Sequence, residues 1–219
     1  MALIAAALVA AFALQPVGTF HDGESAARDG EAWLALQVTR PRSALVATTA
    51  RVRRVHDEVA DAAGDATAHE VSTRVADASF LLRGPRLYAG PVATAWTGVA
   101  PLPLSITPLA LKLRGATYRL RLDCTARGDA CNVVLDGGAH AQVLLRLPAG
   151  RYNDGSLMLG DDAAPALLFA GDLDHDGHLD LILDSTDHYN VSQPTLYLSS
   201  GTDAGALVRQ VALHRSTGC

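Results

Sequence analysis

The sequence predicts an all-β fold, organised as a mainly antiparallel sandwich or a barrel-like domain. Short stretches of alternating apolar and polar residues recur along the chain, and turn residues separate them. No long segment shows the apolar spacing of an amphipathic helix. Four prolines between residues 90 and 108 exclude a helix of any length from that region, because proline lacks the amide hydrogen that a helix requires.

The clearest predicted elements are two hairpins in the middle of the chain. Leucines alternate with small or basic residues over 109–113, Gly115 marks a turn, and the alternation resumes over 118–122. A second hairpin is predicted from 132–135 and 141–147. Its turn is glycine-rich, which suits the positive φ angles of tight hairpins.

Further strands are predicted on both sides of these hairpins. In the first half of the chain they cover 33–38, 45–55 as one long strand, and 71–75 as the return strand after a hairpin tip at 63–66. In the last third they cover 166–169, 181–183, 195–198 and 206–213.

The first residues predict export to the periplasm or the cell exterior. Residues 2–9 are almost unbroken aliphatic, and Ala11-Phe12-Ala13 fits the small-x-small pattern of a cleavage site. The apolar run is too short to span a bilayer, which needs about 20 residues. No Lys or Arg precedes it, so a plain apolar N-terminal helix is the alternative. We therefore expect a signal peptide over 1–13, a flexible segment over 14–30, and a single β domain over 31–219.

The cysteines agree with export. Cys124 and Cys131 flank a short polar segment between two strand-like stretches, so a disulfide there would clamp a hairpin and persist in an oxidising compartment. Cys219 is the odd cysteine, either free or paired with another chain.

Charge and composition limit the partners. The formal net charge is −5, which argues against a nucleic-acid binder, because such proteins usually carry a basic surface. No run of Lys and Arg is present that would attract an anionic membrane. Arg119 and Arg121, with Arg114 nearby, could bind an anionic partner, but a solvated outer face is the expected place for them.

One loop carries the strongest chemical signal. Asp172, Asp174 and Asp176 alternate, Gly177 permits a sharp turn, and Asp180 follows at the ninth position of the loop. Calcium takes six to eight oxygen ligands at about 2.3–2.6 Å, and alternating carboxylates supply them. The backbone carbonyl of His178 is expected to add another oxygen. Four carboxylates this close repel one another without a cation, so the sequence predicts one bound Ca²⁺.

The loop is not an EF-hand. That motif needs a glutamate at the twelfth position, which is Leu183 here. The sequence on both sides of the loop also predicts strands rather than helices.

Residues 169–181 resemble an FG-GAP or VCBS-type repeat in the spacing of the aspartates, the glycine and the aliphatic residue after Asp180. Such repeats form the blades of integrin-like β-propellers and bind calcium between two strands. The resemblance covers 166–200, and His175 stands where the family often has Gly or Asn. Because one copy cannot build a propeller, the resemblance implies the calcium turn and not the propeller fold.

The function expected from these observations is an exported calcium-binding β protein with a structural or recognition role. Its partner, a protein or a glycan, is not identified by the sequence. The alternative is a secreted hydrolase with a structural calcium ion, since Ser185 and His188 lie near Asp184 and Asp187. However, no Gly-x-Ser-x-Gly or His-Glu-x-x-His motif supports it. A glycan face could come from Trp33, Trp96 and Tyr189, although core or plain surface positions are the expectation for each.

Overall fold

The computed structural model describes residues 11–39, 42–96 and 100–218. These residues form 21 strands and no helix, which confirms the all-β prediction. Accordingly, nothing in the described ranges is a helix long and apolar enough to cross a membrane. Most of the predicted export signal, residues 1–10, and the odd cysteine, Cys219, lie outside the described residues.

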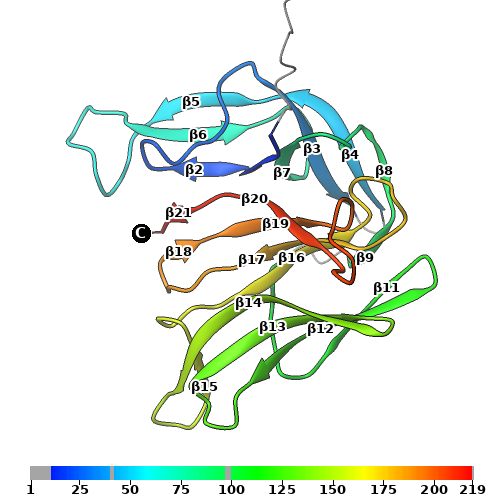
Figure 1. Ribbon diagram of the computed structural model, residues 1–219. Helices are drawn as coiled ribbons and strands as arrows, with labels where there is room; N and C mark the ends of the chain where they lie inside the picture. Colours follow the sequence, from blue (N-terminus) through cyan, green and yellow to red (C-terminus); the bar gives the residue numbers. More distant parts are fainter. Residues whose placement is uncertain (1–10, 40–41, 97–99, 219) are drawn as a thin grey trace, which may run out of the picture.

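The strands form four stacked antiparallel sheets and one small pair (Figure 1). The cap sheet contains β2 (Gly18–Phe20), β6 (Ala68–Ser72) and β5 (Arg51–Val55). The N-terminal sheet has the order β1 (Ala13–Pro16), β7 (Ala78–Arg83), β3 (Ala32–Thr39), β4 (Arg42–Thr49) and β8 (Gly90–Val92).

The other two sheets come from the second half of the chain. The central sheet has the order β10 (Leu102–Pro103), β16 (Ala166–Gly171), β17 (Asp180–Asp184), β19 (Pro194–Leu198) and β20 (Arg209–Leu213), and β9 (Thr94–Trp96) pairs with β16. The curled sheet runs through β11 (Leu109–Leu113), β12 (Ala116–Cys124), β13 (Ala130–Gly137), β14 (His140–Arg151) and β15 (Leu157–Leu159). The small pair is β18 (Val191–Ser192) with β21 (Ser216–Thr217).

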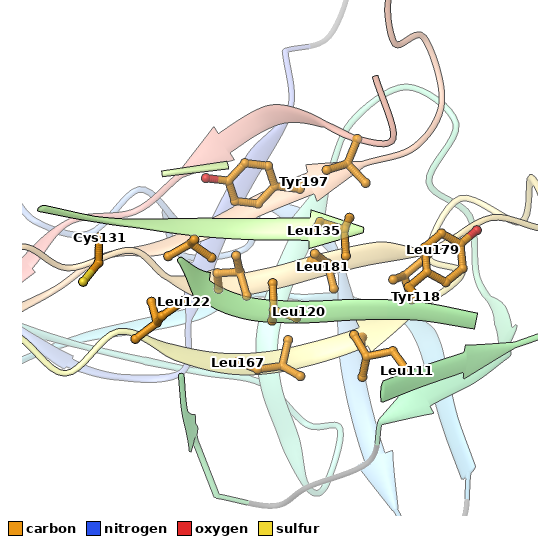
Figure 2. Close-up of a cluster of buried hydrophobic side chains, with 14 of the residues drawn as sticks. Leu111, Tyr118, Leu120, Leu122, Cys131, Leu135, Leu167, Leu179, Leu181 and Tyr197 are labelled. Atoms are coloured by element: carbon orange, nitrogen blue, oxygen red, sulfur yellow. The ribbon is translucent and has the colours of Figure 1, made fainter. Parts of the chain in front are cut away.

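The central sheet is buried on both faces. On β17, Leu181 and Leu183 pack into a core shared with the curled sheet, whereas Ile182 packs into a second core shared with the N-terminal sheet. Figure 2 shows the first of these cores, in which Leu120 of the curled sheet lies near Leu181. Burial on both faces explains why β17 reads as a continuous apolar run rather than an alternating one.

The N-terminal sheet is also covered on both faces. Leu82 of β7 points into the core shared with the central sheet, and its neighbour Leu81 points into a third core beneath the cap sheet. The alternation along one strand therefore supplies two different cores, because successive side chains leave a strand on opposite faces.

The two predicted hairpins of the curled sheet are confirmed. β11 pairs with β12 across the turn at Gly115, and β13 pairs with β14. The prediction of one long strand over 45–55 is wrong, because the chain breaks at the buried Ala50. The Ala50 amide donates to the Glu31 carbonyl at 2.9 Å, and its carbonyl accepts from Gly30 at 2.9 Å. These bonds mark where the chain leaves the N-terminal sheet for the cap sheet.

The expectation of a flexible segment over 14–30 is also wrong. This segment contains β2 and most of β1, which pair with β6 and β7. Gln15 is fully buried, and its side-chain oxygen accepts from the amides of Ala26, at 2.6 Å, and Ala27, at 3.2 Å. The polar composition that suggested a loose segment therefore includes a glutamine that organises the turn after β2.

The predicted disulfide is present. Cys124 and Cys131 are directly opposite each other on β12 and β13, and their sulfurs are bonded. The bond closes a loop with a sequence separation of 7 residues.

Removing this disulfide should lower the free energy of unfolding by about 2 kcal/mol, because the bond restricts the unfolded chain. The variant is Cys124→Ser with Cys131→Ser, and the measurement is urea unfolding. Dithiothreitol should bring the wild type to the midpoint of the variant and leave the variant unchanged. Coincident curves for the oxidised wild type and the variant would contradict the prediction.

Candidate cation site

The acidic loop connects β16 to β17. It is anchored in two cores, the one between the central and N-terminal sheets and the one between the central and curled sheets. Leu173 is fully buried in the core of the N-terminal sheet, and Leu179 is buried in the core of the curled sheet. The Asp172 amide donates to the Ala93 carbonyl at 2.8 Å. At Gly171 a Cβ atom would lie 2.7 Å from that same carbonyl, so the close approach requires glycine. The loop is therefore a fixed part of the fold.

Three of the predicted ligands come together. Carboxylate oxygens of Asp172, Asp174 and Asp176 all lie within 4.8 Å of one another. Asp172 is 0% exposed and Asp174 is 4% exposed, whereas Asp176 reaches the surface. The group could hold a metal ion.

Several oxygens of this group have no protein partner. Both carboxylate oxygens of Asp174 and the Oδ1 atom of Asp172 are buried without a hydrogen bond. Buried polar atoms are nearly always satisfied, and a buried carboxylate without partners is costly. Burial, together with the charges of Asp176 and Asp172, raises the pKa of Asp174 above its usual range. The nearby Ser200 hydroxyl and Asp176 amide partly offset this rise, although neither has the distance and angle of a hydrogen bond to Asp174. A cation among these oxygens would satisfy them.

Asp180 has a different position from the one predicted for it. Its Oδ2 atom accepts from the amides of Leu173, at 2.6 Å, and Asp174, at 3.3 Å. Its Oδ1 atom accepts from the amide and hydroxyl of Ser199, at 2.8 and 2.9 Å. It is not one of the three clustered carboxylates, and its hydrogen bonds connect the start of the loop to the end of β19. Burial and the nearby charge of Asp174 raise the pKa of Asp180 to about 8.

The two histidines of the loop lie at its surface. The His178 amide donates to Asp176 Oδ1 at 2.8 Å, which closes the second half of the turn. His175 has a φ of 62°, in the left-handed region that Gly and Asn adopt most readily. Its ring contacts the Pro91 carbonyl at 3.1 Å and stacks on Tyr88 at 5.8 Å. These contacts hold the His175 ring while its backbone is in the left-handed region.

Two further residues of the site come from distant parts of the chain. Arg114, at the tip of the β11–β12 hairpin, places its Nη2 atom 3.2 Å from Asp172 Oδ2. Ser199, just after β19, has its hydroxyl 3.0 Å from Asp176 Oδ1 and 2.9 Å from Asp180 Oδ1, so its single proton can be donated to either carboxylate. The alternating pattern around Arg114 favoured a solvated face over an anionic partner, and it did not indicate contact with the acidic loop. No local spacing marks Ser199, because its role depends on the pairing of β17 with β19.

The residues of the alternative hydrolase site do not converge. The Ser185 hydroxyl is buried against Thr195, at 2.7 Å, whereas His188 pairs with Asp161 at 2.9 Å. Asp184 caps backbone amides and Asp187 faces Arg215. The aromatic residues considered for a glycan face are also dispersed. Trp33 is buried in the core beneath the cap sheet, Trp96 packs on the core of the curled sheet, and Tyr189 is exposed.

Comparison with known proteins adds no relative. The chain matches no protein-family model, no curated protein and no solved structure. The chemistry of the site itself therefore has to indicate the function.

Proposed function

We propose that the protein is an exported calcium-binding β protein in which the ion has a structural role at the junction of several sheets. One observation carries this proposal: Asp174 is buried, both of its carboxylate oxygens are unpartnered, and it lies against Asp172 and Asp176. The disulfide supports export, since such bonds persist in oxidising compartments.

The donor set favours calcium over a transition metal. The clustered groups are carboxylate oxygens, which suit hard cations, and neither imidazole nor thiolate belongs to the group. Asp172, Asp174 and Asp176 would hold the ion, and the resemblance to FG-GAP repeats adds the backbone carbonyl of His178. The same pattern assigns Asp180 as a ligand. In this protein Asp180 supports the loop through the hydrogen bonds that it accepts from the amides of Leu173 and Asp174.

The position of the loop explains what a structural ion would do. The loop contacts the segment before β9 through Ala93, the curled sheet through Arg114, and the end of β19 through Ser199. Neutralising its carboxylates would remove their mutual repulsion at the point where these elements meet. The ion would therefore stabilise the packing of the central sheet against its neighbours, and so shape a surface for a protein or glycan partner.

Calorimetric titration with Ca²⁺ tests the proposal. The wild type should bind one ion with a dissociation constant of about 10⁻⁴–10⁻³ M, the range of extracellular calcium modules. Asp174→Asn should weaken binding by about tenfold or more, because it removes the charge of the buried ligand whose two carboxylate oxygens are both unpartnered. Asp65→Asn, at the exposed tip of the β5–β6 hairpin, is the matched control and should bind like the wild type. Absence of saturable binding, or equal binding by Asp174→Asn, would refute the site.

Arg114→Gln should tighten calcium binding by about three- to tenfold, because it removes a positive charge that shares Asp172 with the ion. The guanidinium is largely exposed, which limits the effect through solvent screening. Gln, like Arg, has a Cβ atom, so the left-handed backbone at this position, with a φ of 47°, is strained equally in both. Arg119→Gln on the same hairpin should leave affinity unchanged. Weaker binding by Arg114→Gln would show that the arginine supports the loop rather than competing with the ion.

A further inference from the structure

A second candidate binding site lies at the far end of the curled sheet. This site is a cavity. Arg114, which contacts the acidic loop, lies just before the start of β12. The cavity lies at the other end of β12, where Leu122 and Cys124 line it. Figure 1 shows that β12 runs away from the β11–β12 turn, so the cavity is remote from the acidic loop. Its volume is about 630 Å³. That size lies within the range of small-molecule sites, about 300–1,000 Å³.

The floor of this cavity is aliphatic. Leu104, Leu122, Leu157 and Leu159 line it, and they come from the segment after β10, from β12 and from β15. Leu122 and Leu159 are buried, and the other two are half-buried. The leucines that close the core of the curled sheet therefore also present apolar surface to the cavity, where a hydrocarbon chain would replace water.

The rim of the cavity is cationic. Arg127 and Arg151 are the charged side chains among its described lining residues, and both are exposed. In the part of the chain that the structure describes, neither arginine forms an ion pair. Arg151 donates from Nη1 to the Gly155 carbonyl at 2.7 Å, which holds its guanidinium at the end of the β14–β15 hairpin. Two unpaired arginines on a protein with a net charge of −5 favour an anionic ligand.

The wall that carries Arg127 is covalently fixed. The segment between β12 and β13 is closed by the Cys124–Cys131 disulfide, and Cys124 itself lines the cavity. Within this segment the Gly128 amide donates to the Thr125 carbonyl at 2.9 Å. A preformed site loses less conformational entropy on binding than a mobile one.

We propose that this cavity binds an anionic amphiphile, with an aliphatic chain on the leucine floor and a carboxylate on Arg127 and Arg151. The proposal is independent of the calcium site, because it shares no residue with it. The aliphatic floor excludes a purely polar anion as the preferred ligand, and the two arginines disfavour a cationic or neutral one.

Decanoate is the probe, used below its micelle concentration in calorimetric titrations of the full chain. We expect saturable binding at one site, with decanol, decyltrimethylammonium and acetate each weaker by about tenfold or more, since each lacks the charge or the chain. Arg127→Gln combined with Arg151→Gln should weaken decanoate binding by at least about tenfold. Arg146→Gln, exposed on β14 and outside the cavity lining, is the charge-matched control and should bind like the wild type.

A second variant tests the floor independently. Ala164→Trp places a large side chain at an exposed lining position, and it should abolish decanoate binding while the melting temperature stays at the wild-type value. The proposal is overturned if decanoate does not saturate, if decanol binds as tightly, or if the double arginine variant binds like the wild type. Unchanged binding by a folded Ala164→Trp protein would overturn it as well.

Discussion

Phe169→Ala is expected to destabilise the protein by about 3–5 kcal/mol, the range observed when a buried phenylalanine is truncated. Phe169 lies on β16 in the central sheet and is 1% exposed. Its ring packs into the core shared with the N-terminal sheet and also lies against Gly171, at the entrance to the acidic loop. Truncation would therefore leave a cavity between two sheets and loosen the start of the loop.

Urea unfolding measures this effect, with Val143→Ala as the control. Val143 is 55% exposed on β14, so its truncation should change the free energy of unfolding by less than about 0.5 kcal/mol. Phe169→Leu should fall between the two, because it retains much of the apolar volume. Equal stabilities for Phe169→Ala and Val143→Ala would show that the central sheet is not buried on the face that carries Phe169.

Calcium is expected to raise the melting temperature by about 5–10 °C when it is present at about one hundred times its dissociation constant. A ligand that binds only the folded state contributes about 2.7 kcal/mol at that concentration. A protein of this size gains about 2–4 °C for each kcal/mol. Differential scanning calorimetry with calcium and then with a chelator measures the shift, and Asp174→Asn should remove most of it. Sodium chloride at equal ionic strength is the control for general screening.

This calcium-dependent shift should grow between about pH 5 and about pH 8. In the metal-free protein the pKa of Asp180 is raised to about 8, and that of Asp174 is also raised. Groups with a raised folded pKa stabilise the protein below their unfolded pKa, about 3.9, and this contribution is lost as the pH rises through the folded pKa. The chelated protein should therefore lose stability over this window, while calcium, which favours the ionised carboxylates, counteracts the loss. A shift that is constant with pH would contradict the assignment of the ion to this loop.

Three features could be predicted from the sequence because they depend on neighbouring residues. The hairpins of the curled sheet follow from strict alternation interrupted by glycine, which is a local steric property. The clustering of Asp172, Asp174 and Asp176 follows from their spacing around Gly177, whose φ of 91° allows the turn. The pairing of Cys124 with Cys131 is likewise a consequence of one hairpin.

Other features depended on long-range contacts that local patterns do not record. The break at Ala50 is set by bonds to Gly30 and Glu31, and the segment over 14–30 is ordered by strands near residue 70 and residue 80. Alternation indicates that a strand has two faces, but it does not say which sheet covers each. For that reason the sequence predicted a sandwich or barrel and not four stacked sheets.

The difference between what the sequence determines and what the tertiary structure decides is clearest at the acidic loop. The sequence by itself determined the all-β class, the tight turn and the approach of Asp172, Asp174 and Asp176, since these depend on short-range geometry, although it placed Asp180 in the same group. Only the tertiary structure decided that Asp174 is buried without partners, that Asp180 braces the loop through backbone amides, and that Arg114 reaches Asp172. Burial and partner choice depend on which sheets pack together, and that packing joins residues far apart in the chain.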